Sequence, residues 1–335
     1  MKKNLVDSFG RKHTYLRLSL TDKCNLHCSY CNPITAKFSG VHTKELLSRD
    51  EIVRLVSLFV QDLGIDKVRL TGGEPMVRKD FLEILESLHS LKQIHPFKLG
   101  ITTNGTFLND NIHALKRFGV DSLNISLDSL QSDKFFRITQ GNNYFDVYNA
   151  IIQAKESGFF DVKVNAVIMR GINDDEILDF TRFAIEHDLN VRFIEFMPFQ
   201  NNGWGNNYFV SYHELKKKIQ SNYFLIPIPS HESAVSKDFS IERHKGTVSF
   251  ITSVSEHFCG GCNRLRITSQ GKLKTCLFST HDQELDVREL LRNPVISDET
   301  IACRIQNTLI KKWYQHPDTE TLQQQSHNTM VGIGG

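Results

Sequence analysis

Six strand-like segments alternate with helix-like segments between residues 15 and 196, and this alternation restricts the fold more than any other feature. The first helical pattern opens on a capping box, Ser48 with Glu51, and Asn173 is expected to cap the last. Alternating strands and helices favour parallel strands joined by right-handed crossovers, in an incomplete barrel or a doubly wound sheet. The predicted strands are Tyr15–Leu20, Val68–Thr71, Lys98–Thr103, Leu123–Asp128, Val162–Ile168 and Val191–Phe196.

One face of at least four of these strands is polar, and this decides between the two folds. A sheet covered by helices on both faces would be apolar on both, and a filled barrel would carry branched aliphatic side chains inside. We therefore predict an α/β fold, an incomplete (β/α)6 barrel of the TIM type, whose lumen is wide enough for a polar ligand. The polar positions are Arg17, Ser19, Arg69, Thr71, Asn124, Ser126, Asp128, Lys163 and Asn165.

Three cysteines follow the first predicted strand with the spacing C-x3-C-x2-C: Cys24, Cys28 and Cys31. Three thiolates can hold three irons of a cubane cluster and leave the fourth iron open to a small molecule. A zinc site completed by His27 is the alternative, although His27 lies between two of the cysteines, where chelation by all four would be cramped. The spacing favours an iron–sulfur cluster.

A glycine-rich segment, Thr71-Gly72-Gly73-Glu74-Pro75, follows the second predicted strand. Paired glycines allow a ligand to approach the backbone closely, and Glu74 supplies an acceptor for an ammonium group. Taken alone, the segment is equally consistent with a plain turn.

A second set of three cysteines, Cys259, Cys262 and Cys276, has the spacing C-x2-C-x13-C. A hairpin around Gln270-Gly271 is expected to bring Cys276 back beside the first pair. A zinc site completed by His257, His281 or Cys303 is the alternative, but Cys303 lies in a helical pattern and is expected to be a buried free thiol.

Length and composition set further limits. A chain of 335 residues suggests two domains, which we place at 1–198 and 199–335, where the alternating pattern ends. The net charge of +2 gives no reason to expect a nucleic acid or a membrane surface as partner. No apolar run is long enough for a membrane span or an export signal, so we expect a cytoplasmic protein that keeps its seven cysteines reduced.

The first triad, with Tyr30 before its last cysteine, and the GGEP segment resemble the signature motifs of the radical S-adenosylmethionine (SAM) enzymes. With the second triad, Arg264, Arg266 and the Gly334-Gly335 end, the whole chain resembles the GTP 3′,8-cyclases of molybdenum cofactor biosynthesis. The resemblance implies SAM and two [4Fe–4S] clusters, the second carried by a C-terminal extension of the barrel. It also implies a 5′-deoxyadenosyl radical that abstracts the ribose 3′ hydrogen of GTP and so gives 3′,8-cyclo-7,8-dihydro-GTP.

The resemblance also assigns roles to single residues. It implies that Tyr30, Gly73, Glu74, Ser126 and Met197 bind SAM. It implies catalytic roles for Arg17, Arg266, Gly334 and Gly335, with the last two reaching into the active site rather than fraying. The implied GTP contacts are Arg17, Arg69, Thr102, Lys163, Arg264, Leu265 and Arg266.

The expected partners are GTP, an electron donor and the next pathway enzyme, a cyclic pyranopterin monophosphate synthase. Whether the chain forms a homodimer stays open. Two other functions also stay open. Another radical SAM enzyme with an auxiliary cluster, such as a peptide maturase, would share both triads but would have less need of cations in the lumen. A non-enzymatic iron–sulfur or zinc scaffold would not need the GGEP segment.

Overall fold

The computed structural model describes residues 4–33, 43–158, 161–200, 202–325 and 329–334. Six parallel strands alternate with helices along the first part of the chain, which confirms the predicted pattern. The strands are β1 (Tyr15–Ser19), β2 (Lys67–Thr71), β3 (Lys98–Thr103), β4 (Ser122–Ser126), β5 (Asp161–Ile168) and β6 (Asn190–Glu195). The helices are α1 (Arg49–Gln61), α2 (Phe81–Ile94), α3 (Leu108–Arg117), α4 (Ser132–Thr139), α5 (Tyr144–Glu156) and α6 (Ile177–Glu186).

The C-terminal part of the chain extends the same sheet at both of its edges. Strand β9 (Thr247–Ile251) pairs in parallel with β6, and β10 (Arg264–Ile267) pairs in parallel with β1. Antiparallel strands continue outward from each, so that the 12-stranded mixed sheet has the order β12-β11-β10-β1-β2-β3-β4-β5-β6-β9-β8-β7. The remaining elements are α7 (Tyr212–Gln220), β7 (Leu225–Pro227), β8 (Ser236–Ile241), β11 (Lys272–Lys274), β12 (Glu284–Asp286), α8 (Val287–Arg292), α9 (Asp298–Leu309), α10 (Thr319–Gln325) and α11 (Met330–Ile333).

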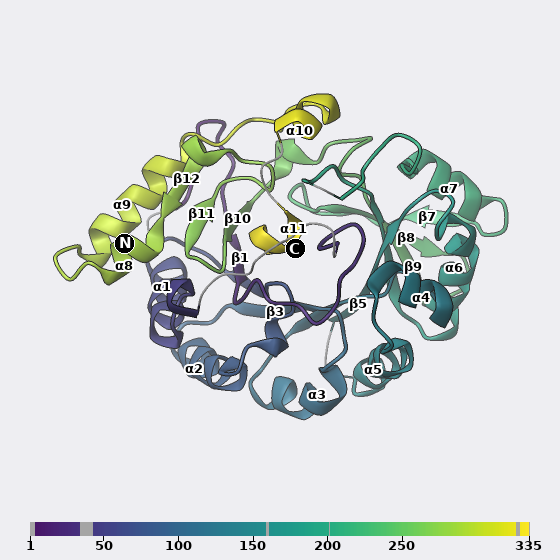
Figure 1. Ribbon diagram of the computed structural model, residues 1–335, viewed down its shortest axis with the longest axis horizontal. Coiled ribbons are helices and arrows are strands. Elements are labelled where there is room, and N and C mark those ends of the chain that lie inside the picture. The colour runs from purple at the N-terminus through teal and green to yellow at the C-terminus, as the bar shows by residue number, and fades with distance from the viewer. Residues whose placement is uncertain (1–3, 34–42, 159–160, 201, 326–328, 335) are drawn as a thin grey trace.

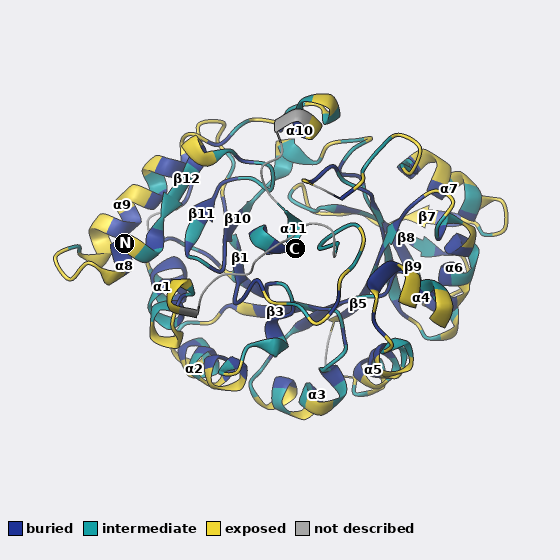
Figure 2. Cartoon of the chain, viewed as in Figure 1, coloured by how far each residue is buried: buried dark blue, intermediate teal, exposed yellow. Residues whose placement is uncertain are grey.

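The sheet curves around a central space with the helices outside it, the arrangement of a partial TIM-like barrel (Figure 1). Along β5, Val162, Val164, Ala166 and Ile168 are buried, while the positions between them are partly exposed. The buried positions pack under helices whose outward faces are exposed (Figure 2). Each fully buried aliphatic or aromatic side chain contributes about 1.5–3 kcal/mol, so the outer face of the sheet stabilises the fold and the inner face remains available for polar groups.

Local sequence signals account for several boundaries. Helix α1 begins with the predicted capping box, because Ser48 accepts from the Glu51 N–H and Glu51 accepts in return from the Ser48 N–H. Asn173 stands at the N-cap position of a 3-10 turn, Asp174–Glu176, that leads into α6, but its side chain makes no capping hydrogen bond, so the predicted cap does not form. The buried amide of Asn173 instead donates to the carbonyls of Asp128 and Val167, and so ties its own loop to the loop after β4 and to the end of β5.

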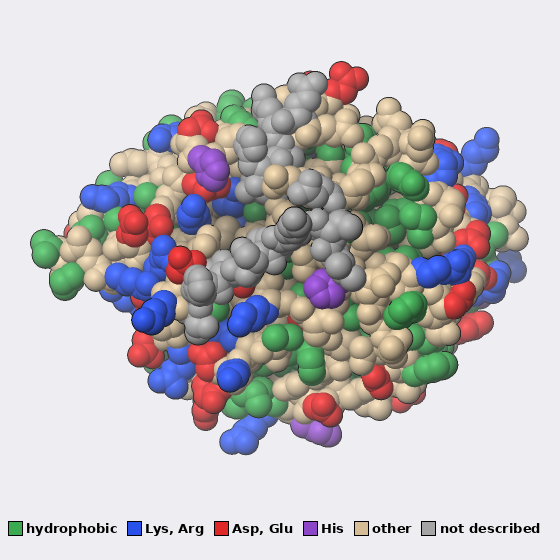
Figure 3. All heavy atoms as spheres, in the orientation of Figure 1, with side chains coloured by type: hydrophobic (Ala, Val, Ile, Leu, Met, Phe, Trp, Pro, Cys, Tyr) green, Lys and Arg blue, Asp and Glu red, His purple; other side chains and the backbone are tan. Residues whose placement is uncertain are grey.

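Other features differ from the predictions or extend them. Helix α4 was not expected, because an eight-residue helix is too short to show a clear periodicity. The expected hairpin is confirmed as β10 and β11, which pair antiparallel. No helix in the described ranges is long and apolar enough to cross a membrane. Acidic and basic side chains are interspersed over the face seen in Figure 3, in keeping with the nearly balanced net charge.

Candidate active site

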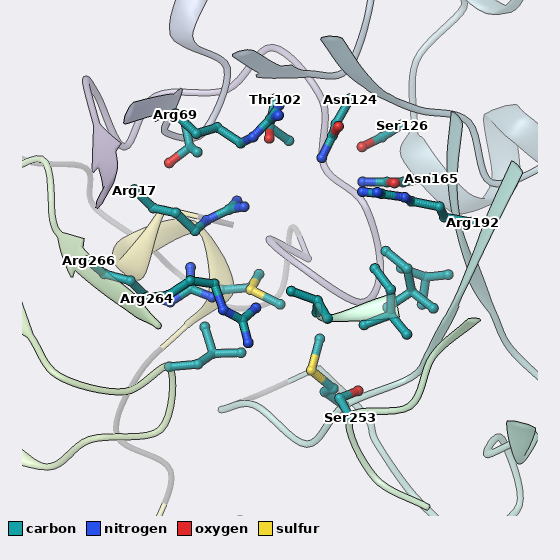
Figure 4. A pocket seen from close by; sticks show the side chains of 18 of the residues that line it. Arg17, Arg69, Thr102, Asn124, Ser126, Asn165, Arg192, Ser253, Arg264 and Arg266 are labelled. Atoms are coloured by element: carbon teal, nitrogen blue, oxygen red, sulfur yellow. The ribbon is translucent and has the colours of Figure 1, made fainter. Parts of the chain in front are cut away.

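A cavity of about 580 Å³ lies inside the curved sheet, and all six cysteines of the two triads line it. Eight of the nine polar positions predicted to face a lumen also line it, the exception being Ser19. The prediction of a polar lumen is therefore confirmed. In Figure 4, Arg17, Arg264 and Arg266 project into this space from one side, and Asn165 and Arg192 project from the opposite side.

The strand topology places the two triads at opposite ends of the cavity. Cys24 follows the carboxyl end of β1, whereas Cys262 precedes the amino end of β10. Since β1 and β10 are parallel, these are opposite ends of the sheet. Strand β11 runs back antiparallel to β10 and so returns Cys276 to the side of Cys262, as the hairpin predicts. A ligand in the cavity can therefore meet one triad at each end.

The first triad is a set of closely coupled thiols. Burial, together with the charges of Cys24 and Asp128, raises the pKa of Cys31 to about 12. Burial also raises the pKa of Cys28 well above its usual value, and the two other cysteines add to the effect. Such thiols ionise only beside a compensating positive charge, which the irons of a cluster would supply, so the donor set fits a [4Fe–4S] cluster.

The zinc alternative needs ligands that converge on a single ion. Within the described ranges, no three His, Cys, Asp or Glu side chains form a group of that kind. Of the proposed fourth ligands, His281 lies on the surface and pairs with Glu284. Cys303 is exposed on α9, so the expectation that it is buried is wrong.

Tyr30 is fixed beside the first triad by an acid that also faces the cavity. Its hydroxyl donates to Asp128 Oδ2 at 2.8 Å, and Asp128 Oδ1 accepts from the Val167 N–H at 2.9 Å. Burial raises the pKa of Asp128 to about 6. The structure brings Tyr30 together with the other predicted SAM contacts Gly73, Ser126 and Met197, all of which line the cavity.

The two glycines of the GGEP segment have a different immediate role from the one predicted. A Cβ atom on Gly72 would lie 2.5 Å from the Thr21 carbonyl oxygen, and one on Gly73 would lie 2.4 Å from that of Lys23. The Gly73 and Glu74 N–H groups donate to those same two carbonyls. The glycines therefore allow this segment to pack against the backbone that leads into the first cysteine loop.

Glu74 likewise differs from its predicted position. Its side chain is fully buried and is not among the residues that line the cavity. Its carboxylate accepts from the Met76 and Asn104 N–H groups and from the Thr103 hydroxyl, at 2.7–3.1 Å. Burial raises the pKa of Glu74 to about 7. The Glu74 carboxylate therefore ties the end of β3 to the segment that follows β2.

Three arginines occupy matching positions on adjacent strands. Arg17 on β1 is in register with Arg266 on β10 and with Arg69 on β2. Burial and the charges of Arg17 and Arg264 lower the pKa of Arg266 to about 9, and burial with the charges of Arg69 and Arg264 lowers that of Arg17 to about 10. Charges that repel one another in a buried site indicate that an anion binds there.

Arg69 is more fully satisfied by the protein than the sequence suggested. Its guanidinium donates at 2.7 Å to the Tyr15 hydroxyl, the Ile101 carbonyl and the Ser122 hydroxyl. Leu265, another implied GTP contact, lies in the hydrophobic core, because alternation along β10 directs only Arg264 and Arg266 into the cavity. The Leu265 side chain therefore does not line the site.

The opposite wall carries two further cations. Lys163 on β5 forms an ion pair with Asp161, and burial and the charge of Arg192 lower its pKa. Arg192 on β6 was not predicted, although it lies on the same alternating face as the other polar positions. That alternation was the signal that could have found it. Thr102 on β3 also lines the cavity, as predicted.

The second triad lies among cations. Burial would raise the pKa of Cys262, but the charges of Arg264 and Lys312 lower it to about 6. The Arg264 guanidinium lies 3.8 Å from Cys262 Sγ and 4.7 Å from the centre of the Phe258 ring. Three thiols beside two cations again match the donor set of a cluster with one open iron. Lys312 was missed, because it follows α9, far from the cysteines in sequence.

The C-terminal segment enters the barrel, as predicted. Gly334 is buried, and its carbonyl accepts from the Thr71 hydroxyl at 3.1 Å. It has a φ of 77°, and a Cβ atom there would lie 2.6 Å from Ser19 Cβ, so glycine is required both by the backbone and by the space. Met330 lines the cavity. Gly335 lies outside the described residues.

Comparison with known proteins agrees with this geometry. The family model described as "Radical SAM superfamily" matches residues 18–184, and "Molybdenum Cofactor Synthesis C" matches residues 189–318. Among solved structures, Streptococcus suis SuiB bound to S-adenosylmethionine has a TM-score of 0.61 at 14% identity, over 96% of this chain and 72% of that one. That likeness shows the fold. The chain is thus a radical SAM enzyme, a class that uses SAM and a [4Fe–4S] cluster.

Curated relatives identify the family within this class. The mitochondrial GTP 3′,8-cyclase of Arabidopsis thaliana is 45% identical, over 99% of this chain and 83% of its own length. The GTP 3′,8-cyclase of Thermodesulfovibrio yellowstonii is 39% identical, over 99% and 100%. The chain spans about half of the mouse molybdenum cofactor biosynthesis protein 1, at 43% identity. The chain belongs to the GTP 3′,8-cyclase family.

Proposed function

We propose that this chain converts GTP to 3′,8-cyclo-7,8-dihydro-GTP, with SAM bound at the Cys24 end of the cavity and GTP between the two triads. The observation that carries this proposal is the register-matched row Arg266–Arg17–Arg69, placed between two sets of three cysteines. A triphosphate is the kind of ligand that offsets several buried cations, and arginine binds phosphate oxygens in pairs.

At the first triad, Cys24, Cys28 and Cys31 would hold a cluster whose open iron binds SAM. Tyr30, Gly73, Ser126 and Met197 would contact SAM, because they line the same end of the cavity. Glu74 would act indirectly, by fixing the loop that Gly73 belongs to. When bound and reduced, the SAM and cluster would supply a 5′-deoxyadenosyl radical for removal of the hydrogen atom from ribose C3′. Bonding of C3′ to guanine C8 would leave an unpaired electron on the base, and one electron from the electron donor with a proton at N7 would complete the 7,8-dihydro product.

At the second triad, Cys259, Cys262 and Cys276 would hold another [4Fe–4S] cluster with an open iron, in the region 199–335. Arg264 and Arg266 leave β10 beside this triad, and Arg17 faces them from β1. Lys163 and Arg192 face them across the cavity. These cations would hold GTP in one orientation, and orientation is the main contribution that a protein makes to such a reaction.

The C-terminal glycines would complete the site. Gly334 is buried against Ser19 and Thr71, the last residues of β1 and β2. These strands carry Arg17 and Arg69, and β1 leads into the first triad. A backbone without side chains fits this crowded position and would exclude water from the radical. An electron donor and an enzyme that accepts the cyclised nucleotide are the partners this reaction requires.

Product analysis tests the proposal. Anaerobically reconstituted, reduced protein should convert GTP and SAM into a cyclised nucleotide and 5′-deoxyadenosine, and ATP in place of GTP should give no cyclised product. Formation of 5′-deoxyadenosine without any change in GTP would favour another radical SAM activity. No SAM cleavage in protein that carries its clusters would contradict the enzymatic function altogether.

A further inference from the structure

Lys312 is a buried lysine whose partners are unusual. Lys312 is only 4% exposed and lies in the segment that follows α9. Within the described part of the chain, no carboxylate forms an ion pair with it, whereas the similarly buried Lys274 pairs with Glu284. Because an uncompensated buried ammonium is costly, the anion that Lys312 faces must come from another group.

The acceptors of Lys312 lie beside two cysteines of the second triad, Cys262 and Cys276. Its Nζ lies 3.6 Å from Cys262 Sγ and 3.0 Å from the Arg264 carbonyl oxygen, and it also donates to the Thr275 carbonyl. An ammonium group has three N–H donors, and these contacts use all three. Thr275 directly precedes Cys276, so one ammonium joins the C-x2-C turn to the returning strand.

A second buried cation fixes the segment that carries Lys312. Arg11 donates to the Trp313 carbonyl at 2.6 Å, to the Tyr314 carbonyl at 2.7 Å and to the Cys259 carbonyl at 2.6 Å. Asp7 holds Arg11 in place through Nε at 2.6 Å. The main chain that directly follows Lys312 is therefore tied to Cys259, the remaining cysteine of the second triad. At the second triad Arg11 contacts a main-chain carbonyl, that of Cys259, whereas Lys312 contacts a cysteine sulfur.

We propose that Lys312 is a positioning residue for the second cluster: it aligns Cys262 with Cys276, and its N–H···S contact and charge raise the reduction potential of the cluster held there. This inference rests on the proposed second cluster. Hydrogen bonds and positive charge at cysteine sulfurs favour the reduced, more negative state of a cluster, so their loss lowers the potential.

The test uses the full chain with Cys24, Cys28 and Cys31 replaced by Ala, so that any cluster signal comes from the second triad. In this background Lys312→Met keeps the length of the side chain and removes the charge, and Lys312→Arg keeps the charge. Lys311→Met, at the exposed neighbouring position, is the matched control. The measurements are iron and sulfide content, the electron paramagnetic resonance spectrum and the midpoint potential.

We expect Lys312→Met to shift the midpoint potential downward and to change the g values relative to Lys311→Met, with Lys312→Arg recovering part of the shift. Equal potentials and spectra in all three would overturn the role of Lys312 and leave the second cluster standing. No [4Fe–4S] signal in Lys311→Met would overturn the second cluster, and this inference with it.

If Lys312→Met takes up no cluster, thermal unfolding of the cluster-free protein decides the outcome. An unfolding temperature equal to that of Lys311→Met would place the loss at the cysteines and support the positioning role. A large drop would assign Lys312 to stability of the fold and overturn that role.

Discussion

Arg17 and Arg266 show at the scale of single residues why we expect the cavity to bind an anion. Arg266 is buried and Arg17 is partly buried, neighbouring arginines repel both, and burial with that repulsion lowers the pKa of each. The protein holds this unfavourable arrangement in the free state, and a triphosphate would relieve it on binding. The binding energy of GTP is therefore expected to depend on these cations much more than the binding of SAM does.

Removing one of these charges should weaken GTP binding selectively. A lost charge-assisted hydrogen bond costs about 1.5–3 kcal/mol, so Arg266→Ala and Lys163→Ala should each weaken GTP binding by roughly 10- to 100-fold. Calorimetry under anaerobic conditions can measure GTP and SAM affinities side by side. Arg137→Ala, which removes an exposed arginine of α4, is the control and should change neither. If SAM affinity fell by the same factor, Arg266 and Lys163 would not act selectively on GTP.

His13 gives a prediction about pH. Burial and the charge of Lys312 lower the pKa of His13 to about 4, against its 3.0 Å hydrogen bond to Asp7. Between about pH 6.5 and pH 4 the unfolded chain binds a proton at His13 that the folded chain does not. Stability from this residue is therefore complete above pH 6.5 and falls as the pH drops, by on the order of 3 kcal/mol.

His13→Gln isolates that contribution from the carboxylates that titrate in the same range. Urea unfolding of the cluster-free protein should show that the stability advantage of the wild type over the variant shrinks between neutral pH and about pH 4.5. A constant difference across this range would mean that His13 has the same pKa in the folded and the unfolded chain.

At the scale of elements, the strands were predictable and the loops between them only in part. Alternation of polar and apolar residues predicted all six strands to within about two residues. It also predicted the polar lumen, because successive side chains of a strand point alternately to the helix-covered face and to the cavity. The parallel attachment of β9 and β10 to the two edges was not predictable, since it depends on pairing between distant segments.

The candidate site was predictable to the extent that it follows local motifs. Both triads and most of the lumen cations were identified from spacing and alternation. The side chains of Glu74 and Leu265 are buried and do not line the cavity, and motif membership does not reveal which way a side chain faces. Lys312 and Arg11 reach the second triad only through tertiary contacts, which leave no signal in the sequence.

The C-terminal segment is the element whose removal is most informative. Deleting Gly334 and Gly335 should abolish most of the cyclisation while leaving cluster content and SAM binding unchanged, because Gly334 packs on Ser19 and Thr71 and not on the cysteines. Gly334→Ala should act in the same direction, since its φ of 77° disfavours a side chain. Full activity of the truncated chain would mean that the C-terminal segment has no role in the reaction.

At the scale of the whole molecule, the topology separates the radical source from the substrate site. Parallel β1 and β10 place the triads at opposite ends of one cavity, so each can be removed without disturbing the other. Cys24→Ala should abolish 5′-deoxyadenosine formation. Cys276→Ala should retain slow, uncoupled SAM cleavage but give no cyclised nucleotide. Cyclisation by Cys276→Ala at the wild-type rate would refute the substrate role of the second triad.

Hydrogen transfer from the substrate tests the central claim most directly, because it requires GTP to lie between the triads with its ribose toward SAM. Reduced, reconstituted protein is incubated with SAM and GTP deuterated at C3′, and the 5′-deoxyadenosine is analysed by mass spectrometry. The account predicts one deuterium in 5′-deoxyadenosine for each molecule of cyclised product. Cyclised product accompanied by unlabelled 5′-deoxyadenosine would contradict it.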